Sequence, residues 1–456
     1  MTIQLPPPVA RIKDIFLQNG YSLYLVGGCV RNSLLKRPIV DWDLTTNAAP
    51  EDMLSLFPTA FYDNSFGTVG IPVEYEGEKL VVEVTTFRTE QDYTDARHPG
   101  SVAWGKTIEE DLERRDFTIN AIAFDLEKQI IIDPFGGQKD LENKIIRAVG
   151  DEDKRFKEDA LRLMRAIRFA TQLSFQIEDA TWKAIIKDSV LLERISEERI
   201  RDELLKILAS EYPYEGVILL KNAELLSHIL PELLEGIGIS QQRPGRHHTE
   251  DVFTHNVLSL KFCPSKNPIV RFATLIHDIG KPRVLGTDKE GLVIFYNHEV
   301  AGSRLAYEIC NRLHFSKKDR EKIVKLIRWH MFTVDEHITD AAIRRFIRRI
   351  GVENVKDMID LRIGDRLGSG IPEERAESWR LKMFKDRLEK ELQPAPFSIN
   401  DLAIDGNDLM NELKVQPGPL IGKLLQSLFE EVDEDLSLNT KDQLLSRARQ
   451  LQSEIE

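Results

Sequence analysis

The sequence predicts an α+β protein, with a small mixed sheet and helices near the N-terminus and an all-helical remainder. In residues 1 to about 150, strand-like runs alternate with helical segments, and the clearest run is VVEVTTF at Val81–Phe87, which is dense in β-branched residues. From about residue 151, apolar residues instead recur with helical spacing, as in Ala160–Leu173 and Glu197–Ser210. A chain of 456 residues is long enough for two to four domains.

The predicted elements follow one another in a simple order. The strands are Ser22–Val26, Val40–Leu44, Thr68–Tyr75, Leu80–Phe87, Ala121–Asp125 and Gln129–Asp133, and the first helices after them are Ala160–Leu173, Glu197–Ser210 and Tyr214–Ala223. Loop breaks near residue 231 and at 241–245 precede a histidine-rich helical stretch, and residues 392–398 have the composition of a linker before a last helical unit. We therefore predict four domains, at 1–150, 151–240, 245–395 and 396–456.

Composition excludes several classes of protein. No apolar stretch approaches the ~20 residues that cross a bilayer, and the N-terminus lacks the basic-then-apolar order of a secretory signal. Three widely spaced cysteines argue against a disulfide framework, so we expect a cytoplasmic protein with no membrane partner. The net charge of −13 does not exclude a nucleic-acid partner, because binding needs only a local basic patch, and Arg162, Arg165 and Arg168 recur at three-residue spacing.

A glycine pair and two aspartates near the N-terminus form the first candidate site. Gly27 and Gly28 end a hydrophobic run and precede a helix start with Arg31, so backbone N–H groups there could approach a phosphate closely. Asp41 and Asp43 alternate on a predicted strand and should therefore point the same way. Two adjacent carboxylates repel unless a divalent cation lies between them. Together these features predict a two-metal nucleotidyl-transfer site.

The stretch Leu25–Thr46 resembles the signature of the nucleotidyltransferase superfamily that includes DNA polymerase beta. More narrowly, it is similar to the class of tRNA CCA-adding enzymes shared by bacteria and eukaryotes, and to their poly(A) polymerase relatives. The resemblance implies that Asp41 and Asp43 hold two Mg²⁺ ions. Glu83, on a strand expected beside them, would complete metal coordination and help to deprotonate an attacking hydroxyl. From spacing alone, Glu83 is equally well an exposed residue of an alternating strand.

Residues 113–121, ERRDFTINA, add groups suited to a nucleotide. Arg115 can make a bidentate contact with phosphate, and Asn120 can hydrogen-bond a ribose hydroxyl or a base edge. The segment is similar to the RRD motif of the same family, which contacts the ribose and phosphates. The resemblance therefore implies nucleotide contacts for Arg115, Asp116 and Asn120.

The next motif is an acidic pair followed by an arginine, at residues 158–162. Asp159 and Arg162 lie three apart on a predicted helix, where they could form a surface salt bridge or together match the Watson–Crick edge of a base. The stretch resembles the family's EDxxR template, which selects CTP and ATP. The resemblance implies that Glu158, Asp159 and Arg162 form this template, and that Arg165 and Arg168 follow toward the nucleotide.

The C-terminal half contains a second candidate site, rich in histidine. Its candidate ligands are His255, His277, Asp278, His298, His330 and Asp365. Imidazole and carboxylate ligands suit a transition metal such as Ni²⁺ or Mn²⁺, although a buried His–Asp pair is often only a structural feature. The pattern resembles the HD phosphohydrolase superfamily, which implies a metal-dependent phosphatase domain whose activity the sequence leaves open.

These resemblances imply a nucleotidyltransferase head at 1–150, a neck at 151–240, an HD-type domain at 245–395 and a tail at 396–456 that is a candidate for tRNA contact. The implied reaction adds CCA, or its terminal A, to tRNA from CTP and ATP. Alternatives are a poly(A) polymerase, a partial A-adding or CC-adding enzyme, a protein that is chiefly an HD-type phosphohydrolase, and an RNA-binding scaffold. Residues 89–102 match a flexible loop of the family, which disfavours a CC-only enzyme. The sequence does not indicate the oligomeric state.

Overall fold

The computed structural model describes residues 3–39, 41–62, 67–75, 77–93, 99–242, 250–332, 338–371, 379–391 and 398–455. The chain forms two compact units: Met1–Glu235 with Ile309–Phe315, and Gly236–Glu308 with Ser316–Glu456. The first unit contains the only large sheet among the described residues, and helices dominate the rest, so the predicted α+β class is confirmed. The predicted linker at 392–398 lies outside the described residues, except for Ser398.

A seven-stranded mixed sheet organises the first unit, in the order β3-β4-β5-β2-β1-β8-β9. Its strands are β1 Leu23–Val26, β2 Asp43–Thr46, β3 Phe61–Tyr62, β4 Thr68–Tyr75, β5 Glu78–Thr86, β8 Ala123–Asp125 and β9 Ile131–Ile132. Strands β2 and β5 are parallel, whereas the other neighbouring pairs are antiparallel. Leu25, Leu44 and Val84 are completely buried between the sheet and its helices, as the apolar runs predicted.

Two features of this unit differ from the prediction. The strand expected at Val40–Leu44 begins only at Asp43, so Asp41 precedes the strand instead of lying on it; the ladder to β5 starts with Asp43 opposite Glu83. The loop expected at 89–102 is largely an antiparallel ribbon of β6 Arg88–Tyr93 and β7 Pro99–Trp104, whose backbone groups bond to each other, and its residues 94–98 lie outside the described part.

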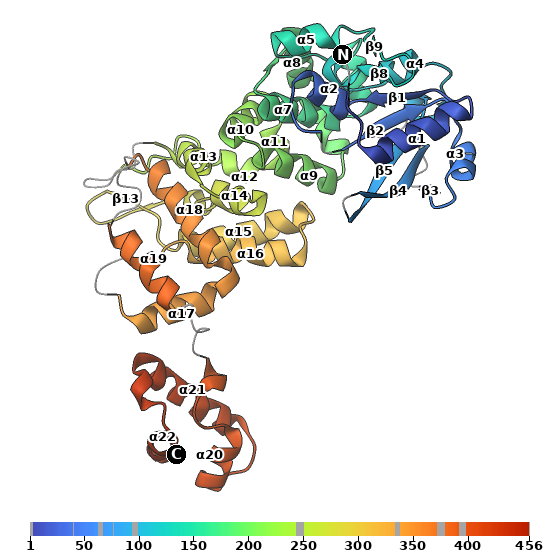
Figure 1. Cartoon of the computed structure of the whole chain (residues 1–456). Helices are drawn as coiled ribbons and strands as arrows, with labels where there is room; N and C mark the ends of the chain where they lie inside the picture. The colour runs from blue at the N-terminus through green and yellow to red at the C-terminus, as the bar shows by residue number, and fades with distance from the viewer. Residues whose placement is uncertain are drawn as a thin grey trace. The chain divides into compact units, whose positions relative to one another are not determined.

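Helices cover the sheet and continue beyond it (Figure 1). The sheet region contains α1 Pro7–Gln18, α2 Gly28–Leu34, α3 Pro50–Leu56, α4 Ile108–Glu113, η1 Thr118–Asn120 and α5 Gly137–Asn143. Beyond it come α6 Glu152–Glu158, α7 Leu161–Leu173, α8 Asp179–Lys187, α9 Glu197–Leu208, α10 Pro213–Asn222, α11 Leu226–Ile229 and α12 Pro231–Leu234, with a short β10 Ile145–Ile146 and β11 Gln176–Ile177. Helices α7, α9 and α10 agree with the predicted ranges to within two residues.

The chain breaks between α6 and α7. Asp159 has an extended backbone, with φ −146° and ψ 103°, and ends α6. The expectation that Asp159 and Arg162 share one helix face is therefore wrong, because α7 begins only at Leu161. The break places the Asp159 side chain at a helix junction, where neighbouring helices rather than its own helix must fix its direction.

The second unit is helical. It contains α13 Val252–Phe262, α14 Pro268–Leu275, α16 Lys317–Trp329, α17 Asp340–Ile350, α18 Val355–Gly368 and α19 Trp379–Glu391, with a short β12 Gly286–Thr287 and β13 Val293–Ile294. Helix α15 His298–Arg312 begins in this unit, and its residues from Ile309 onward belong to the first unit. Three further helices, α20 Gly406–Leu413, α21 Pro419–Glu434 and α22 Lys441–Ile455, bury a core of their own around Leu409, Leu424 and Leu428. In the described residues, no helix combines the length and apolar character that crossing a membrane requires.

Candidate active sites

The glycine pair lies where β1 ends and α2 begins. Gly27 has φ +66°, and a Cβ atom there would come within 3.1 Å of the Arg115 Nη1 atom and 3.5 Å of Asp43 Oδ2. Only glycine accommodates both the positive φ and this close approach. The Gly28 backbone N–H also donates a hydrogen bond to the Asp43 carboxylate, so the turn and the aspartate form one structure.

Three carboxylates gather beside this turn. Asp43 on β2 lies directly opposite Glu83 on the parallel β5, so their side chains share one face of the sheet, and Asp41 lines the same pocket as both. Burial raises the pKa of Asp43; Arg115 works against this rise, whereas Asp41 adds to it. In the part of the chain that the structure describes, the carboxylate oxygens of Asp41, Asp43 and Glu83 do not all lie within 4.8 Å of one another. Three carboxylates that line one pocket nevertheless suit a divalent cation, because their oxygens are hard ligands and the cation would offset their mutual repulsion.

An arginine-rich cleft of about 450 Å³ adjoins the carboxylates and shares Asp43 with their pocket. The cleft is lined by Gly27, Gly28, Arg31, Asp43, Arg114, Arg115, Asp116, Asn120, Asp159, Leu161, Arg162, Arg165, Arg168, Phe169 and Arg199. All the residues predicted to bind nucleotide line it except Glu158. Seven arginines line this cleft, Arg199 among them. Their positive charge and their bidentate hydrogen bonding suit a polyanion such as a nucleoside triphosphate.

Asp116 connects the two sides of the cleft. Its carboxylate accepts hydrogen bonds from Arg165 Nε at 2.7 Å and from Asn120 Nδ2 at 3.0 Å, and Asn120 Oδ1 accepts one from Arg31 at 2.7 Å. Burial alone would raise the pKa of Asp116, but Arg165 and Asn120 outweigh it and hold that pKa well below its ordinary value. The network therefore keeps Arg31 of α2 and Arg165 of α7 ordered across the cleft.

Arg162 is fixed by groups on its own side of the cleft. Its guanidinium donates to Glu158 Oε2 at 2.7 Å and to the backbone carbonyls of Arg155 and Arg114, each at 3.0 Å. The salt bridge of this segment is therefore between Glu158 and Arg162, not between Asp159 and Arg162. Glu158 lies behind the cleft and holds the arginine that lines it.

The Asp159 carboxylate has different partners. It accepts a hydrogen bond from the Leu161 backbone N–H at 3.0 Å and forms an ion pair with Arg199 of α9 at 2.8 Å. Arg199 was not predicted from the sequence, and neither was Phe169, whose ring lies under Arg168 with the guanidinium carbon 4.2 Å from the ring centroid. The sequence did contain one indication of Arg199, because Arg199 and Glu203 lie four residues apart on a predicted helix and therefore share one of its faces.

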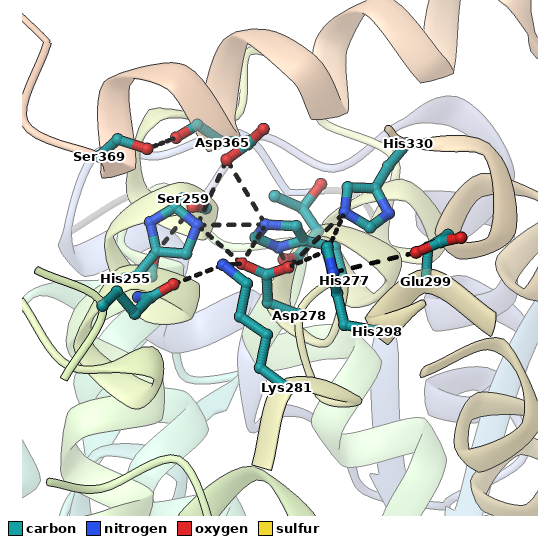
Figure 2. A network of polar contacts seen from close by, with 12 residues as sticks. His255, Ser259, His277, Asp278, Lys281, His298, Glu299, His330, Asp365 and Ser369 are labelled. Carbon is teal, nitrogen blue, oxygen red and sulfur yellow. Dashed lines mark hydrogen bonds and ion pairs between the residues drawn. The ribbon is translucent and has the colours of Figure 1, made fainter. Parts of the chain in front are cut away.

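The second candidate site brings all six predicted ligands together inside the helical unit (Figure 2). His255 Nε2 lies 3.2 Å from Asp278 Oδ2, 3.3 Å from Asp365 Oδ1 and 3.2 Å from His277 Nε2. The other Asp278 oxygen, Oδ1, lies 3.2 Å from His298 Nε2 and 3.6 Å from His330 Nε2. The two oxygens of Asp278 thus face two sets of ligands, which suits two neighbouring cations bridged by one carboxylate.

The imidazole rings are oriented from outside the cluster. His277, His298 and His330 each direct Nδ1 at a backbone carbonyl, those of Thr274 at 2.9 Å, Phe295 at 2.8 Å and Ile327 at 2.7 Å. An Nδ1–H bonded in this way leaves Nε2 as the lone-pair donor, which then faces the centre of the cluster. The rings are therefore arranged as metal ligands usually are.

Charge in this cluster is balanced by basic groups. Lys281 Nζ lies 2.5 Å from Asp278 Oδ2. Burial alone would lower the pKa of His277, but Asp278 and Asp365 outweigh it and raise that pKa to about 10. Burial lowers the pKa of His330. Neutral imidazoles with two carboxylates are a donor set that fits a transition metal, which would take the place of the proton on His277.

Comparison with known proteins identifies the family. Family models match a "Poly A polymerase head domain" at residues 23–147, a "Probable RNA and SrmB-binding site of polymerase A" at 174–236 and "tRNA nucleotidyltransferase domain 2" at 302–448. The CCA-adding enzyme of Lactococcus lactis subsp. cremoris (strain MG1363) is 32% identical over 450 residues, covering 98% of this chain and 96% of that protein. The chain belongs to the CCA-adding enzyme family.

Other members of the CCA-adding enzyme family differ in how much of the chain they match. The enzyme of Geobacillus thermodenitrificans is 48% identical over 235 residues, so the alignment spans 51% of this chain and 57% of that relative. The solved structure of the Bacillus stearothermophilus CCA-adding enzyme in complex with CTP matches with a TM-score of 0.73 and 27% identity, covering 99% of this chain and all of that one. The α+β fold of this chain is therefore shared with a solved structure of a family member.

Proposed function

We propose that this chain adds C, C and A to the 3′ end of tRNA, using CTP and ATP and releasing pyrophosphate. The observation that carries the proposal is the junction at Asp43, where the arginine-rich cleft meets the carboxylate pocket. A triphosphate in the cleft would have its α-phosphate next to the group that holds the catalytic cations. The names of the relatives favour CCA addition over poly(A) synthesis.

Each part of the site has a task in this reaction. Asp41 and Asp43 would hold two Mg²⁺ ions, which supply charge stabilisation to the attacking and leaving oxygens. Glu83 would accept the proton of the primer's 3′-hydroxyl as that hydroxyl attacks the α-phosphate. Arg115 and the Gly27-Gly28 turn would contact the phosphates. Asp159 and Arg162 would read the edge of the base.

The test uses tRNA transcripts that end before CCA, before CA and before A. With CTP and ATP and Mg²⁺, the protein should complete each transcript to CCA and then stop, and sequencing of the products shows the order. Continued addition of A would instead identify a poly(A) polymerase. Products completed only from the last transcript would identify an A-adding enzyme.

We propose a second activity at the histidine–aspartate cluster, the hydrolysis of phosphate esters with a transition metal such as Mn²⁺ or Ni²⁺. The cluster opens into a cavity of about 590 Å³ that is also lined by Lys281, Arg362 and Arg366. Metal ligands beside three basic side chains suit a bound phosphate. A purely structural cluster would need no such cavity.

Metal content provides a direct check on this second proposal. The purified wild-type chain, loaded with Mn²⁺, should contain about two ions per chain in the cluster, because Asp278 faces two ligand sets. His277→Ala should lower the metal content and abolish hydrolysis of a 2′,3′-cyclic nucleotide, whereas nucleotide addition should persist because it uses other ions. His228→Ala is the control, since His228 lies in the other compact unit and its Nδ1 pairs with the exposed Glu193 at 3.0 Å. Metal binding or hydrolysis that does not depend on His277 would contradict the proposal.

A further inference from the structure

We infer that Arg199 of α9 orients the Asp159 carboxylate and thereby determines which bases the site accepts. The inference rests on the proposed nucleotidyl transfer and adds a residue from a helix outside the template segment. Arg199 lines the same cleft as Asp159 and Arg162, although 40 residues of chain separate it from Asp159. Its role is that of a positioning residue, since it acts on the base through Asp159.

Asp159 needs an external anchor because of where it lies. It ends α6 with an extended backbone, so the regular geometry of a helix does not set the direction of its side chain. One carboxylate oxygen accepts the Leu161 N–H at 3.0 Å, and the other faces Arg199 Nη2 at 2.8 Å. Without the second contact, the carboxylate could rotate about its remaining bond. The Arg199 pair therefore fixes which oxygen is presented to the cleft.

Arg162 cannot perform this task for Asp159. Its guanidinium is already engaged by Glu158 and by the carbonyls of Arg155 and Arg114. The two template residues are thus held by different groups: Glu158 and two backbone carbonyls hold Arg162, and Arg199 of α9 holds Asp159. A change at Arg199 should affect one half of the base-reading pair and leave the other half in place.

Helix α9 is itself tied to the cleft at a second point. Glu203, one turn after Arg199, is buried and forms an ion pair with Arg168 of α7 at 2.6 Å. Residues four apart lie on one face of a helix, so both contacts come from the same side of α9. The Glu203 contact with α7 and the Arg199 contact with the junction of α6 and α7 lie one turn apart, so together they keep the Arg199 guanidinium beside Asp159.

The Arg199 guanidinium also has an unused donor. Its Nη1 atom is buried and has no hydrogen-bond partner among the described residues. A buried charged donor without a partner is costly in free energy, so the Asp159 carboxylate is the acceptor that offsets the burial of this guanidinium among the described residues.

The consequence for base selection follows from hydrogen-bond chemistry. Cytosine and adenine present an amino group, which donates to a carboxylate, whereas uracil and guanine present a carbonyl oxygen at the same place. A fixed Asp159 carboxylate would accept from the first pair and repel the second. A mobile carboxylate could turn away from the carbonyl, so discrimination should fall when Arg199 is removed.

The experiment measures kcat/KM for CTP and for UTP on a tRNA transcript that lacks CCA. In Arg199→Ala the ratio of the two values should fall by about 10- to 100-fold, mostly through better use of UTP, and Arg199→Lys should restore part of it. Asp159→Ala should give a similar loss of discrimination. Arg201→Ala is the matched control, because Arg201 lies on the same helix, pairs with Asp202 and does not line the cleft.

The outcomes separate this inference from the proposed function. An unchanged CTP-to-UTP ratio in Arg199→Ala, with both rates lowered equally, would overturn the inference and leave CCA addition intact. A wild-type chain that adds neither C nor A would overturn the proposed function itself. If Arg199→Ala unfolds, Arg199→Gln removes the charge with less change in packing, and the same ratio decides.

Discussion

Asp116 is the residue whose environment most clearly orders the arginine-rich cleft. It is buried, and its carboxylate bonds to Arg165 of α7 and, through Asn120, to Arg31 of α2. A buried carboxylate without such partners would be strongly destabilising. The contribution of this carboxylate to folding should therefore be large and should depend on pH.

We predict that Asp116→Asn lowers the free energy of unfolding at pH 7 by about 3 kcal/mol, since it leaves Arg165 without its charged partner. The pKa of Asp116 is held below the ordinary value of 3.8, so its contribution is complete above that value and fades as pH falls below it. Urea titrations of variant and wild type from pH 7 downward should show a constant difference to about pH 5 that shrinks below about pH 4.

Asp14→Asn provides the control for that series. Asp14 is mostly exposed and pairs with Lys13, so the change should be within about 0.5 kcal/mol at every pH. A difference for Asp116→Asn that grew on acidification would contradict the assigned direction of its pKa.

At the residue scale, the sequence indicated which residues belong to the site better than it indicated which side chains pair with each other. It predicted that Asp116 and Arg165 bind nucleotide, but their direct ion pair joins segments 49 residues apart and depends on tertiary packing. Arg199 was missed for the same reason, because its partner Asp159 lies 40 residues earlier. Spacing along one helix predicts only neighbours on that helix.

At the scale of elements, the crossing of α13 and α18 decides whether the second site can form. His255 lies on α13 and Asp365 on α18, and Gly364 and Gly368 of α18 lie against Ser259 of α13. A Cβ atom at Gly368 would come within 2.3 Å of Ser259 Oγ and 2.7 Å of its backbone N. The glycines therefore permit the close approach that puts the two ligands in contact.

Gly368→Ala should destabilise the helical unit by about 1–3 kcal/mol and weaken Mn²⁺ binding, because α18 must move away from α13. Calorimetry and metal titration measure the two effects. Gly422→Ala on α21 is the control, because a Cβ atom at this position meets nothing within 4 Å. The substitution also replaces a glycine inside a helix by a residue with a higher helix propensity. That control should be neutral or stabilising by up to about 1 kcal/mol. Unchanged metal affinity in Gly368→Ala would contradict the role given to this crossing.

Element prediction succeeded where periodicity extended over several turns. Helices α7, α9 and α10 carry long apolar stripes and were found almost to the residue. The start of β2 and the break before α7 were predicted wrongly, because each depends on a neighbouring element: β2 begins where β5 offers a partner, and α6 ends at Asp159. Local patterns carry little information about such boundaries.

At the scale of the whole molecule, each compact unit contains one candidate site. The arginine-rich cleft and the carboxylates lie in the first unit, and the histidine–aspartate cluster lies in the second. The finer division into head, neck, HD-type domain and tail stays a prediction. So does the assignment of residues 396–456 to tRNA contact.

The central claim is that the carboxylate pocket beside the arginine-rich cleft performs nucleotide addition, and single-turnover addition of C by Asp43→Ala tests it most directly. Glu74→Ala is the matched control, an exposed carboxylate on β4 that lines neither pocket. We predict that Asp43→Ala lowers the rate at least about 1,000-fold while tRNA affinity stays nearly unchanged, because phosphate contacts elsewhere dominate RNA binding. Addition by Asp43→Ala at a rate near that of Glu74→Ala would contradict the claim.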